Sequence, residues 1–249
     1  MLMAERQLKI LNMIQHNGSV QVDELAEVLQ VSTMTIRRDL EKLQQEGVIE
    51  RCHGGAVSKT EVSYADKRVK KHDEKERIAA KAMEFIREGD VVYLDAGTTT
   101  YEIARRIMHI ENMTVVTNDL EIALLMKNSK AELILCGGNV QKSTGSTYGY
   151  YATQMMGDFR FDIGFFGAAA IDEEFQVLTP TTDKAFLKRL LVRQSQRSFL
   201  TVDGSKFNQQ GMNRINSLAD YTAVITDYNF NENKKKLIKK MGAAIIKAF

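Results

Sequence analysis

The stretch Val31-Ser32-Thr33-Met34-Thr35-Ile36-Arg37-Arg38-Asp39-Leu40 decides how the N-terminal part of this 249-residue chain is read. Ser32 is a good helix N-cap, because its hydroxyl can accept a hydrogen bond from an N–H group of the first turn. Ile36, Leu40 and Leu43 recur at helical spacing and make one apolar stripe. The stretch therefore predicts an amphipathic helix that begins after Ser32.

The outer face of this helix is suited to DNA. At about 100° per residue, Met34 and Arg38 lie opposite the apolar stripe, with Thr35 and Arg37 beside them. Gly47 stands where a C-terminal glycine would end the helix. A helix of this kind can read the DNA major groove, although an ordinary surface helix with solvated arginines shows the same pattern. The helix residues that we expect to contact DNA are Ser32, Thr33, Met34, Thr35, Arg37 and Arg38.

Two helical segments precede this helix. Leu8, Leu11 and Ile14 mark a first helix, and the apolar positions in residues 22–29 predict a second, short one. Only Gln30-Val31 separate the second helix from the arginine-bearing helix, which is typical of a helix-turn-helix.

A β-hairpin is predicted directly after the arginine-bearing helix. Residues 48–51 can form a strand, His53-Gly54-Gly55 is a turn signal, and residues 56–58 can return as a second strand. Such a hairpin would be the wing of a winged helix. We therefore expect Arg51 and His53 to lie near DNA phosphates or the minor groove.

This region resembles the DeoR family of bacterial transcriptional repressors. The matching residues are Val31-Ser32-x-x-Thr35-Ile36-Arg37-Arg38-Asp39-Leu40, Gly47-Val48-Ile49 and Arg51-Cys52-His53-Gly54-Gly55-Ala56. This run is long and much more specific than a single glycine motif. The resemblance implies a winged helix-turn-helix domain over residues 1–58 that binds double-stranded operator DNA, in a repressor of a carbohydrate-utilisation operon.

Composition and charge agree with a cytoplasmic regulator. No apolar run approaches the roughly 20 residues of a membrane span, and the N-terminus lacks the apolar core of a signal peptide. Cys52 and Cys136 do not suggest a disulfide framework or a zinc site, so we expect a reducing compartment, no metal and no cofactor. Residues 1–58 carry six Lys or Arg and eight Asp or Glu, so DNA affinity has to come from locally placed cations.

The remainder of the chain alternates strands and helices. Residues 59–75 are polar and lysine-rich, and we interpret them as a solvated linker to an α/β domain over residues 76–249. Continuous apolar strands separated by helices indicate a largely parallel sheet with both faces covered. The predicted strands are 91–94, 115–116, 133–135, 163–166, 199–202 and 223–225.

Several polar loops follow these strands, at the sheet edge where open parallel sheets bind ligands. Asp95-Ala96-Gly97-Thr98-Thr99-Thr100 opens a helix whose N–H groups suit a phosphate. Thr117-Asn118 follows the second strand, and Gly137-Gly138 the third. Asp203-Gly204-Ser205-Lys206 follows a late strand, and the Lys206 ammonium suits a phosphate or a hydroxyl. One such loop is an ordinary turn signal, whereas several together favour a ligand site.

These stretches also resemble the DeoR effector domain, through Leu94-Asp95-x-Gly97-Thr98-Thr99, Val116-Thr117-Asn118, Gly137-Gly138, Asp203-x-Ser205-Lys206-Phe207 and Ile225-Thr226-Asp227. The resemblance implies a domain similar to ribose-5-phosphate isomerase that binds a phosphorylated sugar, which releases the repressor from its operator. The effector-site residues that it implies are Asp95, Gly97, Thr98, Thr99, Thr100, Asn118, Gly138 and Lys206.

The chain departs from the family pattern at two places. It has Lys184 where the family usually has a carboxylate, and Ala168-Ala169-Ala170 where many members have Gly-x-Asn-Gly motifs. Both places lie close to the expected ligand pocket, so the particular sugar stays open, and Lys184 favours a more anionic effector.

Two other function classes compete with the repressor. An isomerase would need a carboxylate base such as Asp95, Asp172 or Asp183 beside a cation such as Lys206, but its acidic motif corresponds here to residues 167–170, which carry no charge. A structural nucleic-acid protein would not need the strand-end loops. We therefore expect a two-state repressor, a homodimer or a larger homo-oligomer, in which ligand binding acts through the linker on the spacing of the DNA-binding helices.

Overall fold

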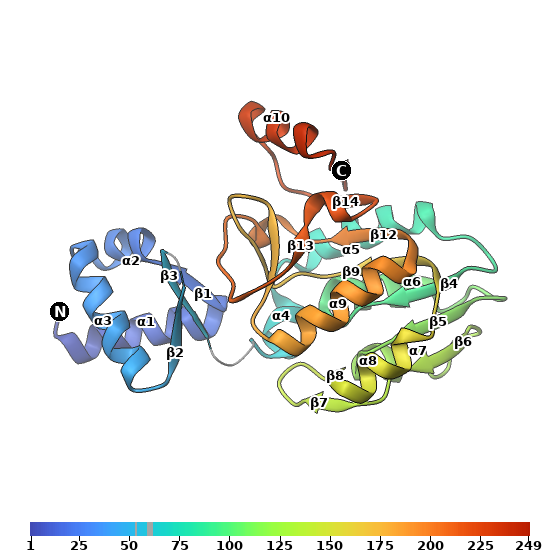
Figure 1. The fold of residues 1–249 in the computed structure, drawn as a ribbon, viewed down its shortest axis with the longest axis horizontal. Helices are drawn as coiled ribbons and strands as arrows, with labels where there is room; N and C mark the ends of the chain where they lie inside the picture. The colour runs from blue at the N-terminus through green and yellow to red at the C-terminus, as the bar shows by residue number, and fades with distance from the viewer. Residues whose placement is uncertain (53, 59–61) are drawn as a thin grey trace.

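A computed structural model describes residues 1–52, 54–58 and 62–249. The N-terminal part lies beside a larger α/β part along the longest axis (Figure 1). Its elements are α1 (Met3–Asn17), β1 (Ser19–Gln21), α2 (Val22–Leu29), α3 (Thr33–Gln45), β2 (Ile49–Cys52) and β3 (Gly55–Ser58). The strands form an antiparallel sheet in the order β1-β3-β2. The predicted helix-turn-helix and wing are confirmed, and β1 is an additional strand too short to show a periodic pattern.

The core of the N-terminal part follows the predicted stripe of α3. Ile36, Leu40 and Leu43 are all buried, and Gly47 ends the helix with a φ of +77°. The predicted first helix is confirmed as α1, although Leu8, one of the residues that marked it, has a side chain that is 59% exposed. The inner face of α1 instead carries Ile10 and the Ile14 side chain one turn later, which pack in the same core.

A buried ion pair joins α1 to α3. Asp39 is buried on the inner side of α3, and its carboxylate accepts two hydrogen bonds from the Arg6 guanidinium, at 2.5 and 3.2 Å. Removing one partner of a buried pair leaves the other charge unpaired, which costs about 3 kcal/mol. Asp39 therefore stabilises the position of the helix whose outer face carries the arginines.

The larger part contains a seven-stranded parallel sheet in the order β15-β14-β12-β9-β4-β5-β6. Its strands are β4 (Val91–Leu94), β5 (Thr114–Thr117), β6 (Glu132–Leu135), β9 (Phe161–Phe166), β12 (Ser195–Thr201), β14 (Ala223–Thr226) and β15 (Ile245–Lys247). The helices are α4 (Tyr64–Val69), α5 (His72–Ala82), α6 (Thr98–Ile107), α7 (Leu120–Met126), α8 (Tyr150–Gly157), α9 (Thr182–Gln194) and α10 (Glu232–Met241). The prediction of a largely parallel α/β domain is confirmed.

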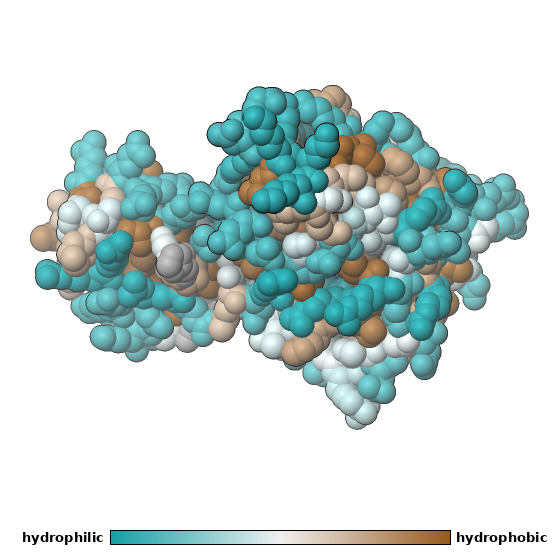
Figure 2. All heavy atoms as spheres, turned by 45° about the horizontal axis from the view of Figure 1, so that its top comes forward, coloured by the Kyte–Doolittle hydropathy of each residue, from teal (hydrophilic) through white to brown (hydrophobic). Residues whose placement is uncertain are grey.

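Helices cover both faces of this sheet. Val92 and Leu94 pack with α5, α6 and α7 on one face, while Tyr93 points to the other face and packs with α8 and α9. This alternation along β4 is the two-residue period of a strand buried on both sides. The lysine-rich α10 lies at the outside of the molecule, where Figure 2 shows a hydrophilic surface.

Two small antiparallel sheets, which the sequence pattern did not reveal, complete this part. One contains β10 (Ala170–Ile171), β11 (Gln176–Thr179) and β13 (Asn213–Ser217), and the other is the hairpin of β7 (Asn139–Gln141) and β8 (Ser146–Tyr148). Short 3-10 helices are η1 (Met83–Phe85), η2 (Gly204–Lys206) and η3 (Leu218–Asp220). None of the helices in the described ranges combines the length and the apolar character that crossing a bilayer requires.

The strand order reverses between β4 and β9. From β4 the chain proceeds to β5 and β6 on one side, and then returns to place β9 on the other side of β4. At such a switch point the two connecting segments leave the sheet in opposite directions and open a crevice at the carboxyl ends of the strands. The fold therefore places Asp95, directly after β4, and Gly167, directly after β9, at the edge of this crevice.

The segment interpreted as a linker is largely helical where it is described. It contains α4 and the first turn of α5, and its last residue, Lys75, is buried and not solvated. The Lys75 ammonium donates hydrogen bonds to the backbone carbonyls of Lys67 and Lys70 and so holds the α4–α5 turn. Burial lowers the pKa of Lys75 from 10.5 to about 8, helped by repulsion from Lys206.

The low pKa of Lys75 predicts a pH-dependent stability. Between the folded pKa of about 8 and the ordinary value of 10.5, the unfolded chain holds a proton that the folded protein has lost, so stability should rise with pH in this range. We expect the unfolding free energy of the wild type, relative to Lys75→Met, to increase by about 2 kcal/mol between pH 7 and about pH 9.5 in urea titrations. If the difference in unfolding free energy between the wild type and Lys75→Met stays constant with pH, the pKa of Lys75 is not lowered in the folded protein.

Candidate functional site

The outer face of α3 carries most of the predicted DNA contacts. Ser32 caps the helix, since its hydroxyl accepts a hydrogen bond from the Thr35 backbone N–H at 3.2 Å and lies 2.9 Å from the Thr35 hydroxyl. Both hydroxyls therefore help to begin the helix. Met34, Arg37 and Arg38 are exposed on the side away from the core. An apolar side chain flanked by two guanidinium groups matches the groups that contact thymine methyls, guanine edges and phosphates.

The wing lies beside this face. Arg51 on β2 makes an ion pair with Glu41 of α3, with Nη1 2.9 Å from Oε1. An exposed pair of this kind contributes less than about 1 kcal/mol, so DNA phosphates can compete with Glu41 for Arg51. The other predicted wing contact, His53, lies outside the described residues.

A cavity of about 420 Å³ lies at the switch point of the large sheet. Of the eight predicted effector residues, the structure brings seven together in its wall: Asp95, Gly97, Thr98, Thr99, Thr100, Asn118 and Lys206. Gly138 is not among the described residues that line it. A Cβ at Gly138 would lie 2.7 Å from the backbone oxygen of Tyr148, so this glycine permits close packing against β8.

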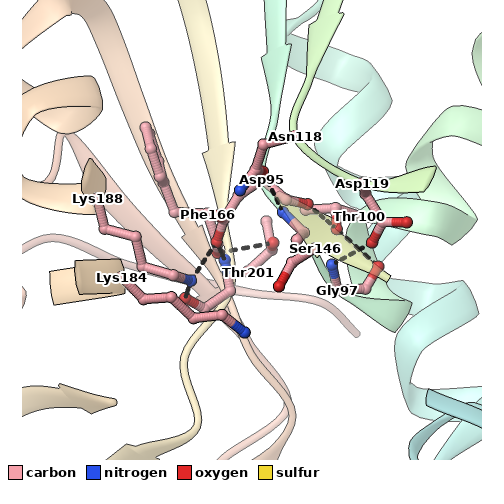
Figure 3. Close-up of polar contacts among 12 residues, drawn as sticks. Asp95, Gly97, Thr100, Asn118, Asp119, Ser146, Phe166, Lys184, Lys188 and Thr201 are labelled. Carbon is pink, nitrogen blue, oxygen red and sulfur yellow. Dashed lines mark hydrogen bonds and ion pairs between the residues drawn. The ribbon is translucent and has the colours of Figure 1, made fainter. Parts of the chain in front are cut away.

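Asp95 joins three elements at the base of the cavity (Figure 3). Its Oδ2 accepts a hydrogen bond from the Gly167 backbone N–H at 2.9 Å and makes an ion pair with Lys188 of α9. The Lys188 ammonium also donates to the Gly167 carbonyl at 2.8 Å. The Oδ1 atom of Asp95 is buried and has no hydrogen-bond partner in the described part of the chain. A buried acceptor of this kind calls for a donor, and a hydroxyl of a bound ligand would supply one.

The loop after Asp95 presents the N-terminus of α6. Gly97 is the N-cap and has no side chain to cap the first turn. The Thr100 hydroxyl donates to the carbonyls of Asp95 and Gly97, at 2.6 and 2.8 Å, and so shapes the loop. Thr98 and Thr99 contribute to the cavity wall beside the backbone N–H groups of this turn. The positive end of a helix and nearby hydroxyls suit an anion such as phosphate.

Asn118 and Asp119, at the end of β5, hold this loop in place. Asn118 Oδ1 accepts hydrogen bonds from the Tyr93 hydroxyl at 2.9 Å and the Ala96 N–H at 3.0 Å. Asp119 accepts a hydrogen bond from the Gly97 N–H at 3.0 Å, and burial raises the pKa of its carboxyl to about 6. Asn118 was predicted as an effector residue, and in the structure its polar atoms position the loop that forms the cavity wall.

The described part of the cavity wall has an excess of positive charge. Among the described residues that line it, seven lysines face three carboxylates, whereas the whole chain has a net charge of only +2. Such a wall attracts anions through its field. The lysines are Lys67, Lys70, Lys71, Lys75, Lys184, Lys188 and Lys206, and the carboxylates are Glu24, Asp95 and Asp203.

Sequence reasoning missed most of these lysines. Lys75 could have been found, because it shares a helical face with Ile78, Ala79 and Ala82, all of which are buried. Lys188 offered no local signal, since its partner Asp95 lies 93 residues earlier.

The N-terminal part also contributes to the cavity wall, through residues that include Ser19 and Ser58. Two hydrogen bonds connect β1 to the loop of residues 207–212, which we call the sensor loop. The Ser19 hydroxyl donates to Gln209 Oε1 at 3.1 Å, and Gln21 Nε2 donates to the Asn208 carbonyl at 2.6 Å. The ligand cavity and the DNA-binding part are therefore in direct contact.

Comparison with known proteins gives consistent matches for both parts. Residues 6–62 match the DeoR-like helix-turn-helix domain, and residues 70–228 match the DeoR C terminal sensor domain. The HTH-type transcriptional regulator GlpR of Haloferax volcanii is 34% identical over 250 residues, which cover 99% of this chain and 98% of that protein.

Two further relatives are named repressors. The glycerol-3-phosphate regulon repressor of Escherichia coli K12 is 34% identical over 227 residues, or 90% of each chain. The putative aga operon transcriptional repressor of E. coli O157:H7 is 33% identical over 250 residues, covering 98% of this chain and 93% of that one. A structure of D-ribose-5-phosphate isomerase is 15% identical with a TM-score of 0.41, covering 55% of this chain and 54% of the other, which is too distant to bear on activity. The chain belongs to the DeoR family and is a helix-turn-helix transcriptional regulator, not an enzyme.

Proposed function

We propose that this protein represses a carbohydrate-utilisation operon and that a phosphorylated sugar in the cavity releases it from operator DNA. The observation that carries the proposal is the buried Oδ1 of Asp95, which has no hydrogen-bond partner among the described residues, in a cavity whose described lining has an excess of positive charge. A phosphorylated sugar has both of the groups that such a site needs, a hydroxyl to donate to Asp95 and a phosphate to lie at the N-terminus of α6. The names of the glycerol-3-phosphate and aga repressors support this class of operon.

The proposed DNA complex uses α3 and the wing of each subunit. One helix-turn-helix covers one half-site, so we propose that the protein acts in the cytoplasm as a homo-oligomer on paired half-sites. Exposed Met34, Arg37 and Arg38 would enter the major groove, while Arg51 would exchange Glu41 for a phosphate. The acidic balance of residues 1–58 favours specific over general DNA binding, because few cations are available for phosphates.

Coupling between the two sites is proposed to run through the sensor loop. Asn208 has a left-handed backbone (φ +57°), and its side chain is held by the Tyr228 hydroxyl at 2.9 Å and by Lys234. Its carbonyl accepts the hydrogen bond from Gln21 of β1. A ligand that contacts the cavity side of this loop would favour one arrangement of the N-terminal part over another, and this difference in affinity is what shifts a two-state equilibrium.

Arg38→Ala tests the DNA-binding face. We expect operator affinity to fall about tenfold, because a guanidinium contact to a base or a phosphate is lost, while ligand binding stays unchanged. Fluorescence anisotropy on DNA upstream of the protein's own operon, at fixed salt and with nonspecific competitor, measures the effect. Arg160→Ala, at an exposed arginine of the α/β part, is the matched control. Equal operator affinity of Arg38→Ala and the control would remove Arg38 from the reading face.

Thr99→Ala and Lys206→Ala test the ligand site. Each should weaken binding of a sugar phosphate about tenfold in calorimetry, since each removes one polar contact to an anion, and each should leave operator affinity intact. Thr153→Ala, whose hydroxyl donates to the Gly149 carbonyl away from the cavity, serves as the control. Unchanged ligand affinity in both cavity variants would show that the ligand binds elsewhere.

Gln21→Ala tests the coupling path. Loss of one hydrogen bond should reduce the ligand-induced drop in operator affinity by about two- to fivefold, with little change in either affinity measured alone. The experiment is an anisotropy titration with and without saturating ligand, with Gln154→Ala on the exposed side of α8 as the control. If the ligand releases Gln21→Ala from DNA as fully as the wild type, the sensor loop contact does not transmit the signal.

A further inference from the structure

The positive net charge of the chain is concentrated on α10. Residues 59–249 carry 28 Lys or Arg and 24 Asp or Glu, and α10 holds five of these lysines and only one of these acids, Glu232. The rest of residues 59–249 is therefore balanced in charge. Because residues 1–58 have a net negative charge, α10 accounts for the positive net charge of the whole chain.

Four of the five lysines share one face of the helix, which we call the lysine face. At about 100° per residue, Lys235, Lys236, Lys239 and Lys240 fall within about 140° of the helix circumference, and all four are exposed. Ile238 lies outside this arc, and its buried side chain packs α10 against the α/β core. Figure 1 shows α10 projecting from the body of the molecule, so the lysine face is accessible to a large partner.

The described residues neutralise little of the lysine face. Lys235 makes an exposed ion pair with Glu232 at 2.7 Å. The ammonium groups of Lys236, Lys239 and Lys240 have no hydrogen-bond or ion-pair partner in the described part of the chain. Two lysine pairs on this face are four residues apart, and like charges at this spacing repel each other. A polyanion bound along the face would relieve this repulsion.

The fifth lysine connects α10 to the DNA-binding part. The Lys234 ammonium donates a hydrogen bond to Asn208 Oδ1, and the Asn208 carbonyl accepts one from Gln21 of β1. Along this path, only the sensor loop stands between the first turn of α10 and the N-terminal part. Duplex DNA held by α3 continues past its half-site, so further phosphates lie beside the N-terminal part when the operator is bound.

We propose that the lysine face binds the phosphate backbone of the duplex DNA that flanks the half-site. From Lys235 to Lys240 the helix advances about 7.5 Å, and phosphates follow each other about every 3.4 Å along the axis on each strand, so the face can reach about two or three successive phosphates. Such contacts supply the general DNA affinity that the acidic N-terminal part lacks. The proposed contact extends the DNA binding of the family and is independent of the proposed ligand.

Duplex DNA fits the lysine face better than a second copy of the chain does. Residues 1–58 of a second copy are acidic too, but by only two charges, with six Lys or Arg against eight Asp or Glu. Duplex DNA carries one negative charge per about 1.7 Å of its axis, so it offers phosphates along the whole face. Lysine binds phosphate as a point charge on a flexible stem, so the contact needs no fixed geometry.

A triple variant of the lysine face tests the proposal. It combines Lys236→Gln, Lys239→Gln and Lys240→Gln, which remove three cations and keep a good helix former at each position. In anisotropy titrations between about 50 and 200 mM salt on a duplex of unrelated sequence, the slope of log affinity against log salt should be smaller by about 2, and affinity at the lowest salt should be at least about tenfold lower. The corresponding triple Arg variant keeps the charge and should behave as the wild type.

Operator length separates flanking contacts from contacts at the half-sites. The wild type should bind an operator duplex with about 20 bp of flanking DNA at each end at least about tenfold more tightly than the same operator trimmed to its paired half-sites. The triple Gln variant should lose this preference and should bind the trimmed duplex as the wild type does.

The matched control removes three exposed lysines near α7 and the β7–β8 hairpin, away from α10: Lys127→Gln, Lys130→Gln and Lys142→Gln. It loses the same net charge and should keep both the salt slope and the preference for flanking DNA. Thermal melting confirms that each variant is folded, and the pair Lys236→Gln and Lys240→Gln replaces the triple Gln variant if the latter is not.

Three outcomes overturn the proposal. If the triple Gln variant and its control have the same salt slope and the same affinities, the lysine face does not contact DNA. If the wild type shows no preference for the flanked operator, its phosphate contacts do not lie beside the half-sites. If the triple Gln variant loses the oligomeric state of the wild type in sedimentation without DNA, the face binds a second copy instead. Each of these results leaves operator reading by α3 and release by a sugar phosphate untouched.

Discussion

The buried contact among Asp95, Gly167 and Lys188 is the constraint on which the ligand site depends. It connects the carboxyl ends of β4 and β9, the two strands between which the sheet reverses its order, and ties both to α9. A buried ion pair is favourable only when further hydrogen bonds satisfy its atoms, and Gly167 supplies one through its N–H and one through its carbonyl. Because the α6 loop starts directly at Asp95, this contact also sets where an anion can bind.

The DNA-binding surface depends on a similar arrangement on a smaller scale. α3 exposes its arginines because Asp39, on its inner side, is paired with Arg6 of α1. The wing sheet connects the DNA-binding surface with the cavity. At one edge of this sheet, β1 contacts the sensor loop, and at the other edge β2 lies beside α3. Only the three-stranded sheet β1-β3-β2 therefore separates the sensor loop from the DNA-binding face of α3.

Long elements with a strong period were predictable from sequence. The cap at Ser32, the stripe of α3 and the apolar parallel strands all follow from spacing within a few residues. Leu8 helped to mark α1 but is exposed, because the sequence of α1 alone does not show which of its apolar residues will contact the other helices. Seven short strands were missed, because a strand of two to five residues leaves little periodic pattern in the sequence: β1, β7, β8, β10, β11, β13 and β15.

By itself, the sequence determined the winged helix-turn-helix, the parallel α/β domain and most residues of the α6 loop, because capping, periodicity and turn chemistry act between neighbours in the chain. Only the tertiary structure decided which lysines surround the cavity, that Gly138 packs away from it, and that the N-terminal part forms one of its walls. Those features join residues such as Asp95 and Lys188, or Gln21 and Asn208, which are 93 and 187 positions apart. Such pairs cannot be predicted from neighbouring residues in the sequence, because it is the folding of distant segments against one another that brings the two partners together.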